Sequence, residues 1–489
     1  MAQPRDTHEF DVVIVGGGLA GLSCALALRD SGLRIALFER DGRLGGRAAS
    51  VPDAMNGIAL DLGPHILLTQ YRNMLDMLDL LGTREHIAWQ RDRFVTLLDG
   101  GERLPMRLYP LPAPLHFFPS LMAVRQLSIR DKLSNARITW LALRASEQHR
   151  LKVDGLTARQ LLNRYGVSDD FQRWFWSTAA LALLNIPLEE CSAAALLRMY
   201  ANLIGRSDYA SGFATKPLAD LFVHPTRALL ERRGVNIETR QHVVRIEARG
   251  THTYAAHLED GRRVRTKACV LAIPPQNVST LLASSSLLSD GWKVPLTRFE
   301  PCPYVSTYLW LDRKVTTERF WSRIWSARNL NTDFYDLSNF RSDVDASRSL
   351  IASNCIYSAA AAGWSDAEII EKTLREIGDF APAARQARVL HSTIHRIPMA
   401  IACPKPGTER ARPDPLTQIN GLLLAGDWTN THLPSCMESA VYSGRLAAEY
   451  ILNGQRHAAA RPFPPPAPNA LVKLIRRLAP PTLQAAESS

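Results

Sequence analysis

The chain has 489 residues, of which 46% are hydrophobic, and it carries a formal net charge of +11. This composition excludes a disordered or fibrous chain, and the length exceeds one ordinary core, so we expect two intertwined domains. The seven cysteines form no Cys-x-x-Cys pair, which argues against a zinc site or a disulfide framework, so we predict no metal site and a cytoplasmic location.

The first ten residues contain charges but no apolar centre, so they do not resemble a signal peptide. The longest uncharged run, residues 268–289, contains prolines, amides and many serines and does not have the pattern of a membrane-spanning helix. The positive charge favours an anionic membrane surface, and we expect a peripheral position on the inner face of the cytoplasmic membrane. Because the charge is spread out and no nucleic-acid module is found, we expect no nucleic-acid partner.

A strand, a glycine turn, a helix and a second strand open the chain. The apolar run 12–15 is typical of a buried parallel strand, and it leads into Gly16-x-Gly18-x-x-Gly21 and a helical pattern. In such a turn the first glycine makes the tight bend, the second lets the backbone approach a pyrophosphate, and the third lets the helix pack on the strand. Glu39 ends the next strand, 18 positions after Gly21, where an acid meets a ribose hydroxyl. The opening therefore predicts a dinucleotide site.

The residues after Glu39 indicate which dinucleotide is bound. Gly45-Gly46-Arg47 follows the acidic strand end, and a nicotinamide cofactor does not need a second glycine pair. An arginine suits charge-assisted contact with phosphate. The segment resembles an extension in flavoproteins of the amine oxidase and carotenoid desaturase superfamily, where the glycine pair and the arginine hold the FAD pyrophosphate. We therefore expect FAD, and the reductant, NADPH or a redox protein, is left open.

Three separated stretches have the pattern of one cofactor domain. We predict an α/β fold in which a Rossmann-like FAD-binding domain is built from residues 9–65, 221–275 and 406–455. An inserted α+β substrate domain takes residues 66–220 and 276–405. Helices are expected at 74–81, 129–145, 157–165, 169–184, 193–204, 366–377 and 439–452, and strands at 235–239, 242–246, 268–273, 303–311, 349–356 and 421–425.

The third stretch carries another flavin motif. Asp427, in Gly426-Asp427-Trp428, follows an apolar strand and can accept a hydrogen bond from a ribityl hydroxyl. A helix that begins near Met437 directs its positive end at a flavin and stabilises the reduced ring. The run 434–444 resembles the C-terminal flavin motif of carotenoid desaturases and, most closely, of squalene-associated flavoenzymes. That family usually has Glu-Gly-Ala where this chain has Glu438-Ser439-Ala440, so a serine side chain is added near the flavin.

The resemblance implies cofactor contacts in all three stretches. We expect FAD to be bound by Gly16, Gly18, Gly21, Glu39, Arg40, Gly45, Gly46, Arg47, Gly63, Val243, Gly426, Asp427, Trp428, Met437 and Ala440.

Over most of the chain the resemblance is closest to the hydroxysqualene dehydroxylases. These FAD proteins of hopanoid-type biosynthesis replace the hydroxyl of hydroxysqualene with hydride. An allylic alcohol leaves as water once it is protonated, so the candidate catalytic acids are Asp61 and His65. Each has a structural alternative, a capping carboxylate for Asp61 and a packed histidine for His65. Tyr71 and Glu438 are weaker candidates.

Large apolar side chains in the first insertion suit a hydrophobic isoprenoid substrate. Trp174, Phe175, Trp176, Leu181, Leu183, Leu184, Phe117 and Phe118 either line a tunnel or belong to the core. The proline- and aromatic-rich run 104–123 is harder to place in a core, and we expect a membrane-facing tunnel mouth there.

Residues 456–489 are expected to form a proline-rich linker and a basic amphipathic tail. In this tail Leu471, Leu474, Ile475 and Leu478 share one helical face, and Lys473, Arg476 and Arg477 share the other. Membrane binding, packing on the body and disorder all stay open for it.

Three functions are compatible with these motifs. The first is an FAD-dependent oxidoreductase of a long isoprenoid, with dehydroxylation of hydroxysqualene as the main hypothesis and a phytoene-type carotenoid desaturase as the alternative. The second is an amine or protoporphyrinogen oxidase on the same fold. The third is a non-enzymatic escort protein like the GDP-dissociation inhibitors, which predicts a degraded flavin site, and the intact glycine motifs argue against it.

Overall fold

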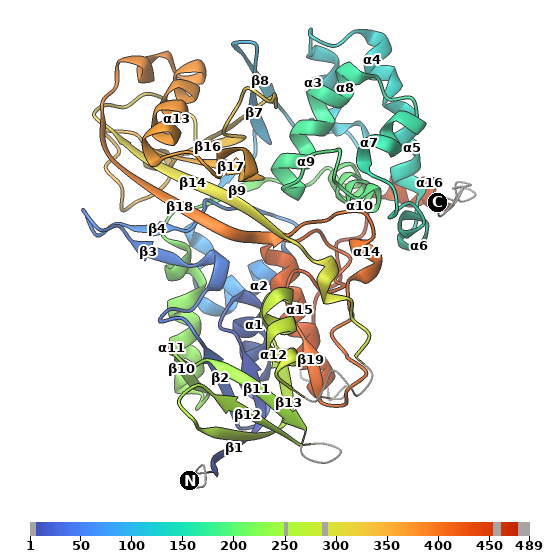
Figure 1. Cartoon of the computed structure of the whole chain (residues 1–489). Coiled ribbons are helices and arrows are strands. Elements are labelled where there is room, and N and C mark those ends of the chain that lie inside the picture. Colours follow the sequence, from blue (N-terminus) through green and yellow to red (C-terminus); the bar gives the residue numbers. More distant parts are fainter. Residues whose placement is uncertain (1–5, 249–252, 286–291, 453–460, 478–489) are drawn as a thin grey trace.

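The computed structural model describes residues 6–248, 253–285, 292–452 and 461–477. A lower part is built on one seven-stranded sheet, and an upper part combines a second seven-stranded sheet with a group of helices (Figure 1). This arrangement confirms the predicted α/β fold with inserted α+β structure, because the chain passes between the two parts several times.

The lower sheet is mostly parallel and draws its strands from three distant stretches. Its order is β10-β2-β1-β13-β12-β11, with β19 beside β13. The strands are β1 (Asp6–Val15), β2 (Ile35–Glu39), β10 (Asn236–Thr239), β11 (Val243–Ala248), β12 (Tyr254–Leu258), β13 (Arg263–Leu271) and β19 (Leu422–Leu424). Val13 and Ile14 are fully buried on opposite faces of β1, which explains why the run 12–15 is apolar at every position.

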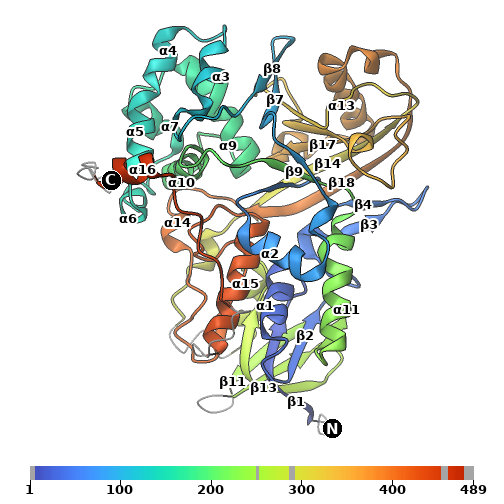
Figure 2. The same cartoon turned by 180° about the vertical axis from the view of Figure 1, so that it is seen from behind.

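Helices cover both faces of the lower sheet. The helices α1 (Leu19–Leu28), α11 (His224–Arg232) and α15 (Met437–Ile451) lie on one face, and α12 (Pro275–Ala283) lies on the other (Figures 1 and 2). The α1 and α15 helices approach closely at Gly444, where an added Cβ would lie 2.1 Å from the backbone oxygen of Ala20. Because these helices come from opposite ends of the sequence, their packing joins the first and third stretches.

The upper sheet has the order β18-β14-β17-β16-β15-β7-β8. Its strands are β7 (Val95–Asp99), β8 (Glu102–Met106), β14 (Pro301–Leu311), β15 (Phe320–Arg323), β16 (Asp333–Asp336), β17 (Leu350–Ile356) and β18 (Val389–Ala402). The helix α13 (Asp366–Phe380) packs on one face, and the other face meets the lower part, where the Tyr308 hydroxyl donates to the backbone oxygen of Asp61 (2.7 Å). The sequence did not predict β18, because Pro398 interrupts its pattern and is tolerated only since the strand lies at the sheet edge.

Short elements complete the fold. They are β3 (Ser50–Pro52) paired with β4 (Ala59–Asp61), the small sheet of β5 (Ile66–Leu68), β9 (Ser211–Ala214) and β6 (Ile87–Gln90), and the helices α2 (Arg72–Leu81), α3 (Phe118–Ala123), α4 (Ile129–Ser134), α5 (Ala136–Arg144), α6 (Glu147–Leu151), α7 (Ala158–Arg164), α8 (Asp169–Phe171), α9 (Ser177–Leu184), α10 (Ala193–Ile204) and α14 (Thr408–Ala411). The helix predicted over 129–145 is divided at Asn135, whose side chain bonds Trp176 (2.9 Å) and Tyr200 (3.1 Å). The helix predicted over 169–184 contains a π-helical turn at Gln172–Trp176.

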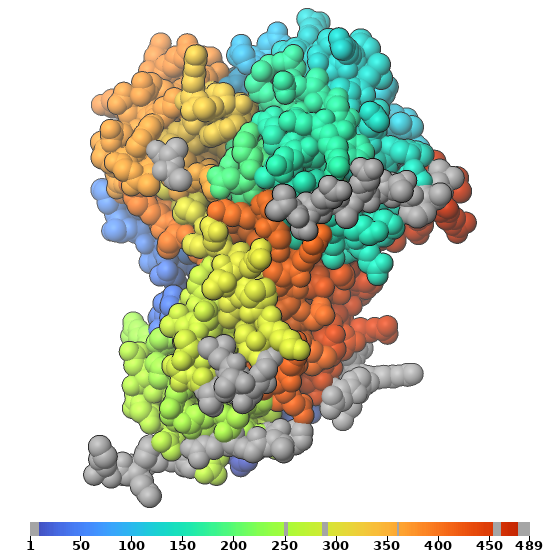
Figure 3. All heavy atoms as spheres, turned by 45° about the vertical axis from the view of Figure 1, so that its right-hand side comes forward, coloured from blue at the N-terminus to red at the C-terminus, as the bar shows by residue number. Residues whose placement is uncertain are grey.

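The described C-terminal residues pack along the body, which was one of the alternatives left open for the tail. The backbone N–H of Phe463 donates to Asn73 (2.8 Å), and the Arg72 guanidinium lies 4.9 Å from the Phe463 ring centre. The helix α16 (Ala470–Arg477) contacts α5, and Figure 3 shows this C-terminal segment against the helical group. Val472 is buried and Leu474 is exposed. Leu478 and the rest of the tail beyond it, with residues 456–460, lie outside the described residues.

Within the described ranges, none of the helices is long and apolar enough to cross a membrane.

Candidate functional site

The first glycine turn combines two tight glycines with one open glycine. Gly16 has φ +106°, and a Cβ on Gly21 would lie 2.0 Å from the Gly16 backbone oxygen, so both must lack a side chain for the turn to close. A Cβ on Gly18 would meet no atom nearer than the Gly46 Cα at 4.0 Å. In the described structure no side chain caps the first turn of α1, so its N–H groups face this open space. A pyrophosphate fits such a cradle.

Glu39 lies at the end of β2 beside this turn. Its two carboxylate oxygens accept the backbone N–H groups of Gly17 (2.7 Å) and Asp41 (2.9 Å). Each oxygen keeps a second lone pair, so ribose hydroxyls can still donate to it. Arg40 makes an exposed ion pair with Asp41 (3.7 Å). Val243 begins β11, shortly after Gln241, whose N–H donates to the Glu39 backbone oxygen (2.9 Å).

The second glycine pair lies directly against the first turn. Gly45 (φ +102°) and Gly46 (φ +57°) are left-handed, and the Gly45 N–H donates to the Gly17 backbone oxygen (2.8 Å). A Cβ on Gly46 would lie 3.2 Å from the Gly18 Cα. The two turns therefore form one continuous backbone surface over the start of α1, which is suited to a phosphate-bearing cofactor.

Arg47 and Asp427 connect the first and third stretches. The Arg47 guanidinium donates to both Asp427 carboxylate oxygens (2.5 and 3.2 Å) and to the Ala400 backbone oxygen on β18 (2.8 Å). Asp427 is buried, and the Arg47 side chain is one-third exposed. Arg47 and Asp427 are two of the residues for which the resemblance implies FAD contact. They lie together at the junction of the two parts, where they form an ion pair with each other.

Trp428 has a packing role. Its ring contacts Phe299 at 5.3 Å between centres, and its indole N–H donates to the Ile273 backbone oxygen (3.1 Å). Gly426 (φ +147°) donates its N–H to Ser443 on α15 (2.8 Å). These bonds fix the loop that presents Asp427.

Sequence reasoning missed Arg412, which holds the same loop from inside. Its guanidinium donates to the backbone oxygens of Asp427 (2.7 Å), Thr429 (3.0 Å) and Leu433 (2.7 Å). Burial lowers the pKa of Arg412 to about 10, so it stays charged at neutral pH. No sequence motif marks this residue, because its three shortest hydrogen bonds go to main-chain groups.

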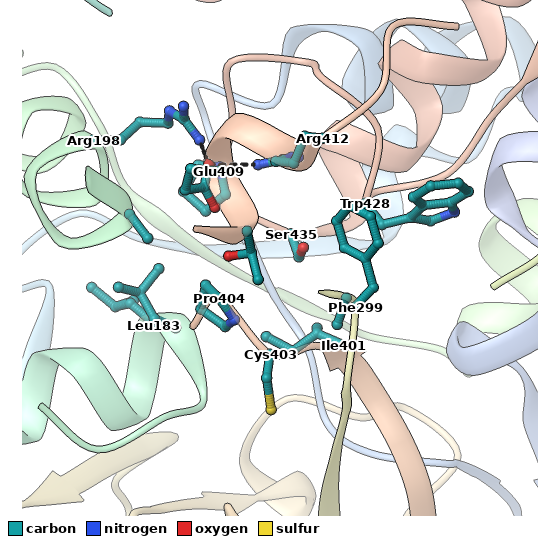
Figure 4. Close-up of a pocket in the computed structure, with 15 residues that line it drawn as sticks. Leu183, Arg198, Phe299, Ile401, Cys403, Pro404, Glu409, Arg412, Trp428 and Ser435 are labelled. Atoms are coloured by element: carbon teal, nitrogen blue, oxygen red, sulfur yellow. Dashed lines mark hydrogen bonds and ion pairs between the residues drawn. The ribbon is translucent and has the colours of Figure 1, made fainter. Parts of the chain in front are cut away.

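A pocket lies beside this loop (Figure 4). Its polar side carries Ser435 and Glu409, and Glu409 makes ion pairs with both Arg198 and Arg412. Its apolar lining is Leu183, Leu184, Phe299, Ile401, Pro404 and Trp428. Leu183 and Leu184 were predicted to contact substrate or to lie in the core, and they line this pocket.

Trp174 and Trp176 lie in the buried core of the upper part. The indole N–H of Trp174 donates to Asp99 (3.0 Å), and that of Trp176 donates to Asn135 (2.9 Å). Buried indoles need such partners.

Met437 and Ala440 are buried in the first turns of α15, whose N-terminus lies behind the Asp427 loop. The Ser439 hydroxyl bonds Thr431 (2.6 Å) and the Asp427 backbone oxygen (3.3 Å), so its side chain is directed to this loop. Ser439 thus stabilises the loop at the position where the resembling family has glycine.

Glu438 and Tyr71, the weaker catalytic candidates, both form hydrogen bonds to neighbouring groups of the protein. The Glu438 carboxylate accepts the N–H groups of Asn73 (3.0 Å) and Met74 (2.8 Å) at the start of α2, and a buried anion at a helix N-terminus is stabilising. Tyr71 is hydrogen-bonded to Cys436, and burial raises its pKa well above the ordinary value.

Asp61 is a buried carboxyl with structural partners. Its Oδ1 accepts the Ser50 hydroxyl (2.6 Å) and the Leu218 N–H (2.9 Å). Burial raises its pKa from 3.8 to about 6. These bonds support the capping role that was the alternative prediction for Asp61.

His65 has a free hydrogen-bond acceptor, its Nε2 atom. Its Nδ1 lies 2.6 Å from the Gly63 backbone oxygen, and because a carbonyl only accepts, Nδ1 carries the hydrogen. Burial lowers the His65 pKa, so the ring is neutral at pH 7 and Nε2 has a free lone pair. His65 is therefore placed to act as a base, whereas the sequence suggested an acid.

Gly63 serves packing. A Cβ there would lie 2.1 Å from the Tyr304 hydroxyl oxygen of the upper sheet. Its missing side chain therefore brings Tyr304 against the 61–65 segment.

Among the described residues, no group of three His, Cys, Asp or Glu side chains is arranged to hold a metal ion.

Comparisons with known proteins show the family and the fold of this chain. The model of the family described as flavin containing amine oxidoreductase matches residues 19–452. The 15-cis-phytoene desaturase of Narcissus pseudonarcissus is 27% identical over 469 residues, covering 92% of this chain and 81% of that protein. The 15-cis-phytoene desaturase of Synechococcus elongatus is 25% identical over 479 residues, covering 92% and 98%. A solved structure of putrescine oxidase shares the fold, with a TM-score of 0.71 and 17% identity over 91% of this chain and 99% of that one.

Proposed function

Because the chain belongs to the family of flavin containing amine oxidoreductases and is an FAD-dependent oxidoreductase, we propose that it desaturates a long apolar isoprenoid of the phytoene class. The observation that carries this proposal is the similarity to 15-cis-phytoene desaturases along 92% of the chain. Proteins that share a cofactor fold differ mainly in the parts that contact substrate. A similarity that extends through the inserted segments therefore supports the substrate class as well as the cofactor.

His65 supports the same reaction. Bound FAD accepts a hydride, a hydrogen with its electron pair, from a carbon atom. The substrate must also lose a proton from the neighbouring carbon before the double bond is complete, and a base takes that proton. The lone pair on His65 Nε2 can receive it, whereas a protonated histidine could not. A separate electron acceptor is the second substrate.

The residue pattern at 434–444 favours a second candidate, the reductive dehydroxylation of hydroxysqualene to squalene. This reaction needs an acid to protonate the leaving hydroxyl. Asp61 has a raised pKa, but its Oδ1 already accepts two hydrogen bonds from Ser50 and Leu218. His65 is neutral, with its hydrogen directed at a carbonyl. The lack of a placed acid in this segment ranks dehydroxylation below desaturation.

Product analysis of the purified, FAD-loaded protein separates these candidates. Phytoene with a quinone as electron acceptor should yield longer conjugated polyenes, seen as new long-wavelength absorption. His65→Ala should lower this rate about 100-fold or more, the typical worth of a positioned base, while His224→Ala, at an exposed histidine, leaves it unchanged. Squalene from hydroxysqualene with reduced enzyme, and no desaturation, would make the second candidate correct. Turnover of an amine or a porphyrinogen alone would overturn both.

We further propose that the protein takes its substrate from an anionic membrane surface. Residues 103–146 contain seven Arg and Lys residues and one acidic residue, Asp131. Exposed large apolar side chains, between 36% and 66% accessible, share this region: Tyr109, Leu111, Leu115, Phe118, Met122, Ile129, Leu133 and Trp140. We call these eight residues the apolar patch. Lys132 of α4 donates to the Met122 backbone oxygen of α3 (3.0 Å), which joins the two helices that carry much of it.

Exposed apolar and basic groups together fit a bilayer of acidic lipids, since the apolar groups enter the interface and the basic groups pair with headgroups. Leu474 and Lys473 of α16, which packs on α5, add one exposed apolar and one exposed basic side chain to the helical group.

Vesicle sedimentation tests this surface. Ile129→Ser with Leu133→Ser should lower binding to vesicles rich in phosphatidylglycerol about tenfold, because two exposed apolar side chains that enter the bilayer are lost. Leu416→Ser, an equally exposed leucine of the lower part, is the matched control and should bind as the unchanged protein does. Unchanged binding by the double variant would contradict the proposal, and a change in oligomeric state would make the patch an interface between copies.

A further inference from the structure

The upper sheet presents a row of buried polar side chains to the lower part. Tyr304, Ser306 and Tyr308 alternate along β14 and share one face. Asn354 of β17 lies in register with Ser306, and Asp333 of β16 lies in register with Asn354. Ser306, Asn354 and Asp333 are each 5% exposed or less. A site for a hydrocarbon has no need of such groups, so their arrangement calls for a reason.

The hydrogen bonds in this row run in one direction. The Asn354 amide donates to Asp333 Oδ2 (3.0 Å), and the Ser306 hydroxyl donates to Asn354 Oδ1 (2.7 Å). The Ser306 and Tyr304 hydroxyl oxygens lie beside each other, since both crowd the position of a Gly63 Cβ, at 3.0 and 2.1 Å. Because the Ser306 hydrogen is already used, Tyr304 is the donor toward Ser306. The Tyr304 hydrogen is thus turned toward Asp333, and its oxygen lone pairs are left facing out of the row.

Asp333 is held as the anchor of this row. Its Oδ1 accepts the Thr332 hydroxyl (2.6 Å), and Tyr335 is also hydrogen-bonded to it. These bonds favour the carboxylate, against burial, which raises the Asp333 pKa. In the described structure no Arg, Lys or His makes an ion pair with Asp333, so its charge is spread through hydrogen bonds alone.

The outer end of the row lies at the candidate reaction site. The Tyr304 oxygen occupies the space that a Gly63 side chain would need, 2.1 Å from its Cβ position. The same Gly63 holds the His65 ring through its backbone oxygen. Tyr304 is only half-buried, unlike the three residues behind it, so it is the residue of this row that is open to its surroundings.

We propose that Asp333 is a positioning residue which, through Asn354 and Ser306, holds the Tyr304 oxygen as an acceptor that stabilises positive charge on the substrate. This inference rests on the proposed function. In desaturation, a C–H bond breaks with its electron pair passing to oxidised FAD, and the carbon becomes cationic until a neighbouring proton leaves to a base. In dehydroxylation, the C–O bond of the protonated alcohol breaks, water leaves, and the cationic carbon takes hydride from reduced FAD. Both reactions benefit from a fixed oxygen lone pair at that carbon.

Binding of a cation mimic tests the inference without turnover. N,N-dimethyldodecylamine is positively charged at pH 7, and dodecanol is its neutral counterpart of similar length. We expect Tyr304→Phe and Asp333→Asn each to weaken amine binding to the FAD-loaded protein about tenfold, the worth of a hydrogen bond to a charged group. Dodecanol binding should change less than about twofold, and the double variant should bind the amine no more weakly than Tyr304→Phe alone. Titration calorimetry measures both ligands.

The variants separate positioning from folding. Asp333→Asn keeps an oxygen for the Asn354 amide but not for the Thr332 hydroxyl, so the melting temperature should fall slightly while FAD content stays unchanged. Ser353→Ala is the matched control, since Ser353 is the buried neighbour of Asn354 on the opposite face of β17 and its hydroxyl has no partner among the described residues. Equal amine binding by the protein and both variants would overturn the inference alone. Failure of the unchanged protein to bind either ligand would overturn the apolar substrate class, and this inference with it.

Discussion

The two seven-stranded sheets organise the candidate site in different ways. On the lower sheet the decisive positions are backbone positions: Gly16, Gly21 and Gly45 allow turns and close approaches that no side chain permits. On the upper sheet the decisive contacts are between side chains, from Tyr304 to Asp333, brought together by three strands. The comparison teaches that the glycine turns of the cofactor site follow from local sequence, whereas the proposed surroundings of the substrate are assembled from residues far apart in the chain.

The largest expected effect on stability comes from disrupting the close approach of Gly21 to Gly16 in the first glycine turn. Gly21→Ala places a Cβ 2.0 Å from the Gly16 backbone oxygen, so α1 must move. We expect the free energy of unfolding to fall by about 3 kcal/mol, at the upper end for overpacking. Urea denaturation measures it.

Gly18→Ala sharpens this result, because its Cβ would meet nothing nearer than 4.0 Å. Stability should change by less than about 1 kcal/mol, while FAD retention in gel filtration falls at least tenfold. A Gly18→Ala protein that keeps its FAD would show that the predicted pyrophosphate contact is wrong.

The next effect concerns Asp61, a side chain of the first stretch that acts within the junction. Its pKa is raised from 3.8 to about 6, so the native state holds this proton more tightly than the unfolded chain does. Stability should therefore decrease as pH rises from about 4 to about 6, and the total loss is about 3 kcal/mol. Asp61→Asn should flatten this part of the profile in urea denaturation at pH 4 to 7. A profile that keeps its slope after the substitution would assign the loss to another group.

Glu438 tests whether a side-chain network also operates on the lower sheet. Glu438→Gln leaves one acceptor oxygen for N–H groups that now bond two, at Asn73 and Met74. The loss should be about 1–2 kcal/mol in unfolding free energy. Glu449→Gln, farther along the same helix, should change it by less than about 0.5 kcal/mol. Equal effects of the two substitutions would mean that the cap on α2 contributes nothing.

The smallest effect is expected at Ser439. Ser439→Gly removes the hydrogen bond to Thr431 (2.6 Å) and restores the Glu-Gly-Ala pattern of the resembling family. We expect a loss of about 1 kcal/mol and no loss of FAD, measured by thermal unfolding and by flavin absorbance. Loss of FAD would indicate that the Asp427 loop depends on this serine.

Elements with a strong local signal could be predicted from the sequence. The opening strand, turn and helix were found because apolar runs and glycine spacing are local properties, and the cofactor prediction, FAD, is confirmed by the family match. The helix over 129–145 was predicted as one element, because nothing local shows that Asn135 is needed by Trp176 and Tyr200. Packing on the body was one of three alternatives left open for the C-terminal tail for the same reason, since the contacts of Phe463 come from α2 and α15.

The sequence by itself determined the cofactor, the fold class and the positions that must be glycine, because a tight turn leaves its requirement in a few adjacent residues. Only the tertiary structure decided what the polar side chains do. It paired Arg47 with Asp427, gave Glu438 to the start of α2, made His65 an acceptor and placed Tyr304 over Gly63. These roles depend on partners far along the chain, and the sequence around a residue does not show which distant group it will bond.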